Sequence, residues 1–162
     1  MSQRTQSILF FLSGLLFALT FFLPLAEYVG ETNILRFNVY GVESILPDGG
    51  VPFGKMFALP VLILTVTIVL ISIYLALGLF RAVKMNQFVK LHRLARVDII
   101  LTVAWIALVF AWYIIAVGKP IAAAPSYRIG AFLPLAALVL LVIAASGLGR
   151  DIKKVRSMDR LR

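Results

Sequence analysis

Few side chains in this chain of 162 residues could carry out chemistry, and the most versatile of them is its single histidine, His92. Asp98 follows six residues later, so the two could act as a base with an orienting carboxylate, or as two ligands of a metal ion. The first arrangement needs a nucleophile beside the base. The second needs further ligands, and the chain has no cysteine. The sequence therefore favours His92 as an interfacial residue, and Asp98 as a helix-start charge or the partner of a nearby arginine.

A second pair of carboxylates, Glu27 and Glu31, would share one face if the first helix continued through both. Two surface acids are weak evidence for acid–base catalysis, because such work needs a positioned group with a shifted pKa. Nowhere does the sequence bring together a nucleophile, a base and metal ligands. We therefore expect no enzymatic activity, no catalytic residue, no metal site and no cofactor.

The composition explains why so few side chains could carry out chemistry. The chain is 62% hydrophobic and 14% charged, whereas a soluble domain is nearer half apolar and a quarter charged. Four apolar runs reach the length of about 20 residues that a membrane-spanning helix needs: Ser7–Ala26, Phe57–Phe80, Ile99–Val117 and Ile129–Gly149. Only helices satisfy backbone amides segment by segment in lipid. The sequence thus predicts an all-α transmembrane fold, a four-helix membrane bundle formed as a single domain over residues 1–162.

None of these runs contains a charged residue or a histidine. Their polar side chains are neutral: Thr20, Thr65, Thr67, Ser72, Tyr74, Thr102 and Ser146. We expect their hydroxyls to bond back to their own helices. A moving charge usually needs an ionisable partner in the membrane, so the pattern argues against a small multidrug exporter, a proton channel or a pump.

The basic residues indicate an orientation. Twelve of the sixteen lie on one side of the predicted spans: Arg4, Arg81, Lys84, Lys90, Arg93, Arg96, Arg150, Lys153, Lys154, Arg156, Arg160 and Arg162. The other four are Arg36, Lys119, Arg128 and Lys55, which share their side with four acidic residues. Because cytoplasmic loops are enriched in lysine and arginine, the bias predicts that both termini are cytoplasmic.

The segments outside the predicted spans have patterns of their own. In the external loop 27–56, Leu35, Phe37 and Val39 form one apolar face and alternate with Ile34, Arg36, Asn38 and Tyr40, which predicts a half-buried strand in a small hairpin, with a turn at Pro47–Gly50. This element could be a lid over the helix ends or a docking edge for a partner. On the cytoplasmic side, Arg81–Asp98 reads as mostly helical, with one face formed by Phe88, Leu91, Leu94, Ala95 and Asp98.

The basic cytoplasmic tail, residues 150–162, carries an apolar stripe of Ile152, Val155, Met158 and Leu161. Such a helix could lie on the membrane surface, continue the fourth span or dock on a partner. Each span also holds one pair of small residues four positions apart, which suits a packed bundle and leaves a homo-oligomer open.

Four segments carry a resemblance to a known family: "MSQRTQSILFFLSGLLF" running to "FFLPLAEY", then "LRFNVYGVES", "YRIGAFLPLAALVLL" and the ending "IKKVRSMDRLR". Together they resemble, in order and along nearly the whole chain, the Bacteroidota family known as domain of unknown function family 4293. The resemblance implies a four-span protein of the bacterial inner membrane with no established activity. It transfers no site residues. A recognisable ending does suggest that something binds the tail.

The leading functional hypothesis is a non-enzymatic accessory or interaction subunit whose basic cytoplasmic face binds anionic lipid or a protein partner. Its candidate binding residues are Arg93, Arg96, Lys153, Lys154, Arg156, Arg160 and Arg162. The alternative is a carrier or channel for a small neutral or lipidic solute, with an outward-facing cavity and Trp105 lining a pocket. We expect no binding of nucleic acid, because the sequence contains no recognisable nucleic-acid-binding module.

Overall fold

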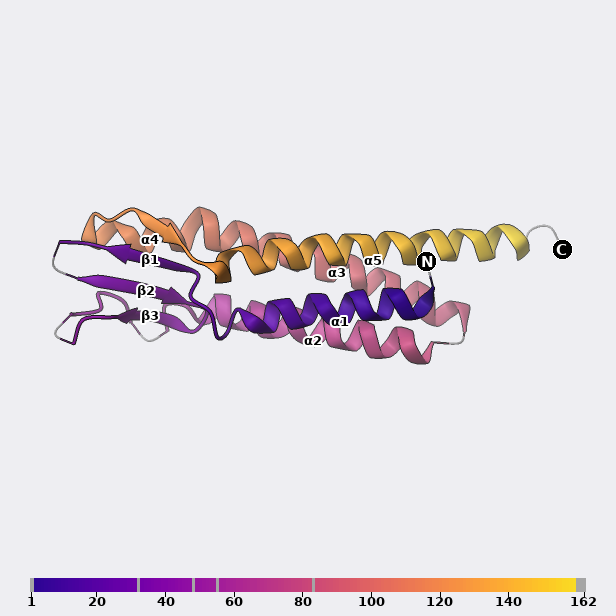
Figure 1. The fold of residues 1–162 in the computed structure, drawn as a ribbon. Coiled ribbons are helices and arrows are strands. Elements are labelled where there is room, and N and C mark those ends of the chain that lie inside the picture. The colour runs from indigo at the N-terminus through magenta and orange to yellow at the C-terminus, as the bar shows by residue number, and fades with distance from the viewer. Residues whose placement is uncertain (1, 32, 48, 55, 83, 160–162) are drawn as a thin grey trace.

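Figure 1 shows a computed structural model of the chain, which describes residues 2–31, 33–47, 49–54, 56–82 and 84–159. It is mostly helical, with a small antiparallel sheet at one end. The helical elements are α1 (Gln3–Leu19), α2 (Leu59–Arg81), α3 (Met85–Leu108), a π-helix η1 (Val109–Tyr113), α4 (Ile114–Gly118), a 3₁₀ turn η2 (Lys119–Ile121) and α5 (Ile129–Asp159).

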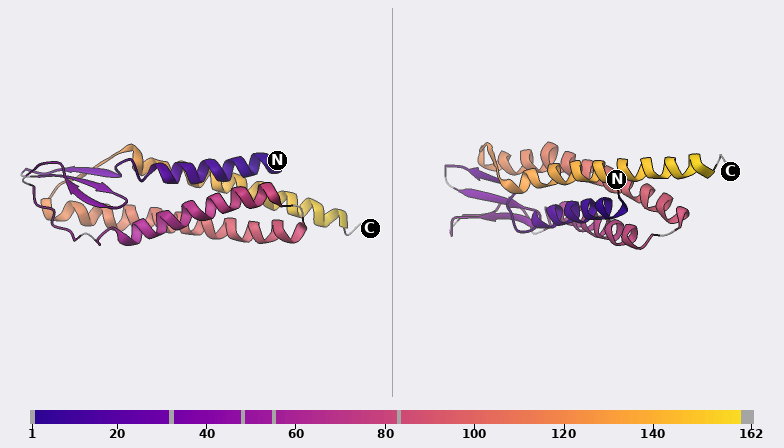
Figure 2. Two further views of the ribbon diagram at one scale, coloured as in Figure 1. Left: turned by 90° about the horizontal axis from the view of Figure 1, so that it is seen from below. Right: turned by 45° about the vertical axis from the view of Figure 1, so that its right-hand side comes forward.

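The helices run side by side, with α1 packed against α2 and α5, and α3 packed against the same two helices. We call the end that carries the sheet the sheet end. The opposite end, where α1 and α3 begin and α2 and α5 finish, is the basic end. Figures 1 and 2 show α5 extending past the start of α1 and the α2–α3 turn, so that its last turns project from the basic end.

Three helices are long and apolar enough to cross a membrane: Leu59–Arg81, Met85–Ile121 and Ile129–Val155. The predicted first span, Ser7–Ala26, is too long, because α1 has 17 residues and finishes at Leu19. The amide of Thr20 bonds the carbonyl of Phe17 in a tightened last turn, and Ala26 already lies on the first strand. Pro24, which has no amide hydrogen to donate, lies in the intervening turn.

The third span is longer than the predicted Ile99–Val117. The helix begins at Met85, as the amphipathic face before Asp98 indicated, and continues through η1 and α4. The tail likewise continues the fourth span, because α5 is one helix from Ile129 to Asp159. This outcome is one of the three that its apolar stripe allowed.

The sheet has four antiparallel strands in the order β3-β2-β1-β4: β1 (Ala26–Val29), β2 (Ile34–Asn38), β3 (Gly41–Ser44) and β4 (Pro125–Tyr127). The predicted alternation holds from Ile34 to Phe37, since Leu35 and Phe37 are fully buried while Arg36 is only half-buried, but it breaks at Asn38, which is buried as well. The hairpin turns between Asn38 and Gly41. Gly49 donates its amide to the carbonyl of Leu46 in the turn that follows, and Asp48 lies outside the described residues.

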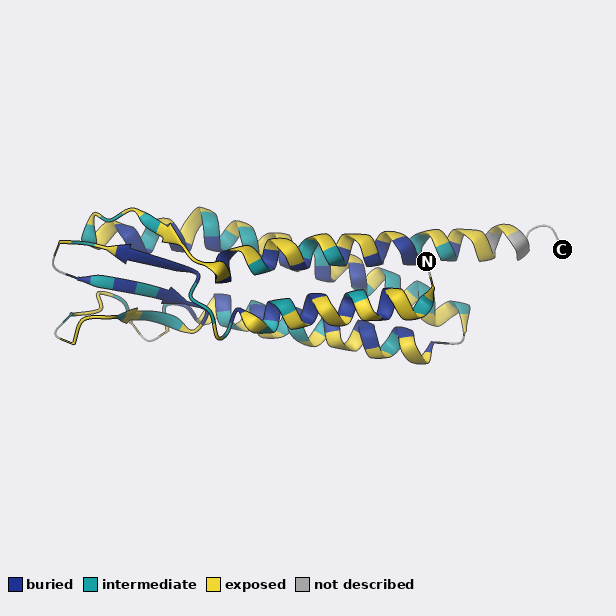
Figure 3. Ribbon diagram, viewed as in Figure 1, coloured by how far each residue is buried: buried dark blue, intermediate teal, exposed yellow. Residues whose placement is uncertain are grey.

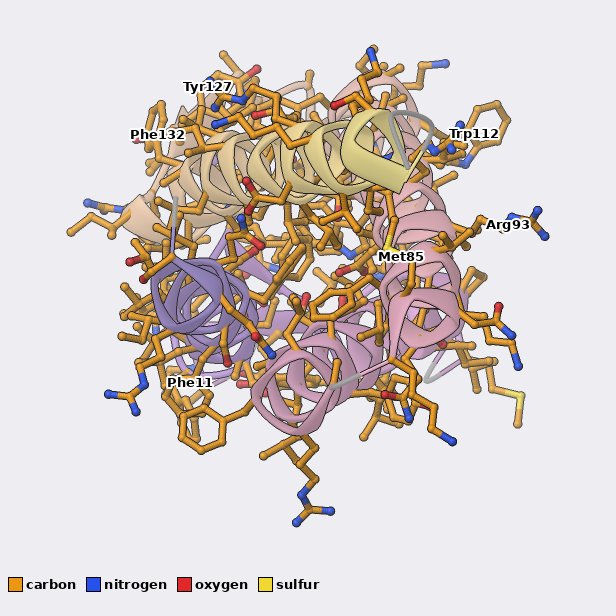
Figure 4. The ribbon with its side chains drawn as sticks, turned by 90° about the vertical axis from the view of Figure 1, so that its right-hand side faces the viewer. Phe11, Met85, Arg93, Trp112, Tyr127 and Phe132 are labelled. Atoms are coloured by element: carbon orange, nitrogen blue, oxygen red, sulfur yellow. The ribbon has the colours of Figure 1, made fainter. Side chains whose placement is uncertain are left out.

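The buried side chains form two clusters stacked along the helices, and Figure 3 shows the buried faces turned inward. The cluster nearer the sheet contains Phe17, Ile68 and Trp105, together with inward side chains of β1 and β2. The cluster nearer the basic end contains Phe10, Leu75, Ala95, Leu141 and Leu148. Large apolar side chains cover the outside as well. Phe11, Trp112 and Phe132 point outward in Figure 4, as a lipid-facing surface requires.

Candidate functional site

The basic end gathers exposed cations from every long helix. Arg93 and Arg96 lie on α3, Lys153 and Lys154 lie on α5, and all four are exposed. Figure 4 shows Arg93 pointing away from the helices. The remaining exposed cations of the described chain at this end are Arg4, Arg81, Lys84, Lys90 and Arg150. Of the other predicted binding residues, Arg160 and Arg162 lie outside the described residues, as does the side chain of Arg156.

Two amides of α1 fasten the basic end together. Gln6 donates from Nε2 to Oδ2 of Asp151 on α5 over 2.6 Å. One turn earlier, Gln3 donates to the carbonyls of Leu79 and Ala82 at the end of α2, the latter over 3.0 Å. These bonds hold the base of the projecting part of α5 and the end of α2 against the same helix.

A cavity of about 270 Å³ opens beside these bonds, between α1, α3 and α5. Its walls are Gln3, Gln6, Met85, Phe88, Leu148, Asp151, Ile152 and Val155. The predicted apolar stripe of the tail therefore begins on the wall of this cavity, with Ile152 and Val155. His92 packs on the other side of α5, where a Cβ added to Gly149 would approach its Cε1 to 3.1 Å.

Asp98 is not at a helix start, and it pairs with no arginine that the structure describes. It is 0% exposed and lies midway along the long third helix, inside the candidate span Met85–Ile121. Its Oδ2 accepts a 2.7 Å hydrogen bond from Oγ of Ser72 on α2. The expectation that the spans hold no ionisable group is therefore wrong, because the third span starts earlier than its apolar run does.

Asp98 belongs to a polar layer, which we define as Ser13, Ser72, Asp98 and Thr102. All four residues are 0% exposed. The layer separates the two apolar clusters, since Ser72 follows Ile68 and precedes Leu75 on α2. Ser13 donates to the carbonyl of Ala137 over 3.1 Å, which joins α1 to α5 at a short distance from the Ser72–Asp98 bond.

Only some of the spans' hydroxyls bond as predicted. Thr65, Thr67 and Ser146 donate to carbonyls of their own helices. Ser72 instead bonds another helix, and Thr102 Oγ1 has no hydrogen-bond partner. The sequence did contain a sign of this arrangement. Asp98 occupies the next position on the apolar face Phe88–Leu91–Leu94–Ala95, and a carboxylate on an apolar stripe faces the core.

Trp105 fills the core. It is 0% exposed, packs edge-on against Phe17 with ring centroids 5.4 Å apart, and donates its indole N–H to Thr65 Oγ1 over 2.7 Å. Trp112, seven residues on, would share its face in a regular α-helix, yet it is exposed. The π-helix Val109–Tyr113 has more residues per turn and rotates the two tryptophans out of phase.

The sheet end is fastened by a carboxylate between two arginines. Arg36, opposite Glu27 on β2, donates from Nε to Oε1 of Glu27 over 3.0 Å. Arg128, which follows β4, donates from Nε to Oε2 over 2.8 Å and also from Nη2. Although burial disfavours the charged form, the hydrogen bonds and positive charges of Arg128 and Arg36 hold the pKa of Glu27 below its usual range. Glu27 and Glu31 do not share a helix face, because Glu27 lies on a strand.

Tyr28, the next residue of β1, reaches the helices. Its hydroxyl donates to the carbonyl of Ile114 on α4 over 2.7 Å. Burial, aided by the nearby Tyr127, raises the pKa of the Tyr28 hydroxyl, which keeps it a donor.

A cavity of about 400 Å³ lies on the outer side of α4, lined mainly by apolar residues from Phe110 to Tyr127.

Comparison with known proteins agrees with the resemblance read from the sequence. A model of the family described as domain of unknown function (DUF4293) matches residues 2–161. No curated protein and no solved structure matches the chain. Since the matched region covers the four quoted segments except Met1 and Arg162, and nearly every residue of the chain, the chain belongs to the DUF4293 family.

Proposed function

We propose that this protein is a non-enzymatic accessory or interaction subunit of the bacterial inner membrane, whose basic end binds anionic lipid headgroups or a protein partner. In this proposal the helices form a four-helix membrane bundle with both termini in the cytoplasm. The basic end then lies at the cytoplasmic leaflet, and the sheet lies outside.

The observation that carries the proposal is the exposure of all nine described cations at the basic end, on four helices at once. A lysine or arginine near an anionic leaflet contributes about 1 kcal/mol of binding free energy. Lys153 and Lys154 lie on the last turns of α5, after the contact of Asp151 with α1, and both are exposed. Glu27, Glu31 and Glu43 lie at the opposite end, and this asymmetry supports the orientation.

The test is purification of the full chain in mild detergent, with bound lipids and proteins identified by mass spectrometry. Two variants remove the projecting charge: a truncation after Val155, and the double substitution Lys153→Gln with Lys154→Gln. Lys119→Gln is the matched control, because Lys119 is an equally exposed lysine at the sheet end.

We expect the control to retain the ligands of the native chain and both charge-removing variants to lose them. Loss of anionic phospholipid alone makes the basic end a lipid-binding surface, and loss of one defined protein makes the chain an adaptor for that protein. If the native chain, the control and both charge-removing variants retain the same lipids and proteins, the basic end serves only to set the topology, and the proposal is overturned.

The alternative, a carrier or channel for a neutral or lipidic solute, receives less support. Such a protein needs a continuous path between the helices. Phe17, Ile68 and Trp105 are fully buried in one cluster, so their side chains fill the space between the helices there. Trp105 also donates a hydrogen bond to Thr65. The strands β1 and β2 cover the sheet end of the same cluster.

A further inference from the structure

The polar layer contains a carboxyl group whose charge nothing in the described chain balances. Asp98 is fully buried and its one hydrogen-bond partner is the neutral Ser72. A buried carboxylate without a cationic partner loses several kcal/mol of hydration with little return. An ionisable side chain at such a place in a membrane protein is by default a candidate for a functional site.

The helices packed around Asp98 bring no charge to it. α2 turns Ile68, Ser72 and Leu75 inward, and its described titratable residues, Tyr74 and Arg81, are exposed. α5 faces α3 with Ala137, Leu141, Ala144 and Leu148, and its charged residues begin only at Arg150. α1 contributes Ser13 and Gly14, with Arg4 exposed at the basic end. On α3 itself, Arg93 and Arg96 are exposed, and His92 packs against Gly149 of α5.

Two oxygen atoms of the layer have no hydrogen-bond partner among the described residues. They are Oδ1 of Asp98 and Oγ1 of Thr102, which lies one turn after Asp98 on the same face of α3. The carboxyl group therefore accepts only the hydrogen bond from Ser72 within the described chain. A buried carboxylate with one neutral donor is more costly than the neutral carboxylic acid at the same place.

The layer is also tightly closed. A Cβ added to Gly14 would approach Cβ of Ser72 to 3.0 Å, so α1 and α2 are in close contact at this level. The cavities described above lie at the ends of the helices. A metal ion with a shell of oxygen ligands needs space, whereas a proton needs none.

We infer that Ser72, Asp98 and Thr102 form a proton-binding site, at which Asp98 is a carboxylic acid while the helices are packed. Proton release breaks the O–H bond at the carboxyl group and transfers the proton to water. The carboxylate left behind needs hydration, so release is coupled to separation of α2 and α3 at this layer. Water reaches the layer from a groove of about 430 Å³ between the two helices, whose walls include Gly78, Leu91 and Leu94.

Infrared spectroscopy of the full chain in lipid nanodiscs tests the inference, because the C=O stretch of a protonated carboxylic acid is separate from the bands of carboxylates and amides. Labelling all aspartates with ¹³C at the carboxyl carbon assigns the band to aspartate. The substitutions are Asp98→Asn, Ser72→Ala, and Asp151→Asn as the matched control, since Asp151 also accepts a side-chain hydrogen bond between helices.

We expect a protonated aspartate band at neutral pH that Asp98→Asn abolishes and Asp151→Asn retains. Ser72→Ala should shift its frequency, because the substitution removes the hydrogen bond to Oδ2. At alkaline pH the band should disappear, and the protection of amide hydrogens in the middle of α2 and α3, corrected for the intrinsic rise of exchange with pH, should fall more than in Asp98→Asn. If Asp98→Asn fails to fold, the labelled native chain and Ser72→Ala still report on the site.

Three results would overturn the inference. One is a native spectrum without a protonated aspartate band at neutral pH. Another is a band that persists at every pH up to unfolding, since such a proton is not exchangeable. The third is a sodium-dependent rise in Tm that is lost in Asp98→Asn, which would make the bound cation a metal ion.

Discussion

Trp105 and Thr65 are joined by a 2.7 Å hydrogen bond between α3 and α2, and the same pair of helices is joined again by Asp98 and Ser72 one heptad away on each helix. Nearer the sheet end, the hydroxyl of Tyr113 bonds the carbonyl of Phe57 over 2.9 Å. Three polar contacts thus follow one antiparallel seam. In the bilayer, leucine packs as well against lipid as against protein, so apolar contacts alone do not select a partner helix. Hydrogen bonds between helices therefore determine which residues meet.

The first prediction concerns this seam. Thr65→Val removes the acceptor of the indole N–H, and we expect the free energy of unfolding to fall by about 0.6 kcal/mol, the average for interhelical hydrogen bonds in a membrane protein, and by no more than about 1.7 kcal/mol. Thr67→Val should cost less, because the Thr67 hydroxyl bonds only its own helix. Unfolding in mixed micelles measures both. A larger loss for Thr67→Val would contradict the importance of the seam.

The second prediction concerns Gly130 in the first turn of α5. A Cβ there would lie 2.4 Å from the carbonyl oxygen of Pro24 and 2.7 Å from that of Leu23, and backbone cannot move aside easily. Gly130→Ala should therefore cost about 1–3 kcal/mol, as overpacking does. Gly41→Ala is the control, since nothing lies within 4 Å of its added Cβ. Equal Tm values for the two variants would show that Gly130 does not lie this close to the carbonyl oxygens of Pro24 and Leu23.

The third prediction concerns pH. Because the folded-state pKa of Glu27 is lowered, its pairing with Arg36 and Arg128 stabilises the fold fully above the ordinary glutamate pKa of about 4.3. That stabilisation is lost as the pH falls through the lowered folded-state pKa. Glu27→Gln should reduce stability at neutral pH by about 1–2 kcal/mol, a modest figure because both arginines are about half exposed. The difference from the native chain should vanish in acid. A difference that is constant from neutral pH to acid would rule out the charge as its cause.

The fourth prediction separates the two amide contacts of α1. Gln6→Ala removes the bond to Asp151 and should speed amide hydrogen exchange in α5 beyond Arg150. Gln3→Ala removes the bonds to Leu79 and Ala82 and should speed exchange at the end of α2 instead. Mass spectrometry of peptides after exchange measures both regions. Identical patterns in the two variants would mean that the contacts do not act locally.

Much of this fold could be predicted because the bilayer leaves the backbone few options. Apolar length located both ends of α2 and the start of α5 to within a few residues, and the period-two pattern located β2, but α5 continues past the predicted Gly149 to Asp159. The strand β4 was missed, because Pro125–Tyr127 has only three residues and pairs with a strand about a hundred positions earlier. Ala26 was assigned to a helix because its apolar neighbours read alike in either state, and only the pairing with Phe37 decides between them.

The polar layer was missed for a different reason. Hydropathy marks the third span from Ile99, one residue after the aspartate, although the helix is continuous across that boundary. Whether Asp98 is buried depends on the face of the helix on which it lies, and the length of an apolar run does not indicate that face. The exposed cations needed no such information, because lysine and arginine stay outside unless paired.

The pairing of β1 with β4 also sets an order of assembly during synthesis. Glu27 and Arg128 are 101 positions apart, so β1 has only β2 beside it while the ribosome makes the intervening residues. Until Tyr127 has been synthesised, one edge of β1 has no partner strand, and any extended segment could pair with it. The segment that carries β4 therefore closes this edge of the sheet, and α5 is synthesised only after it.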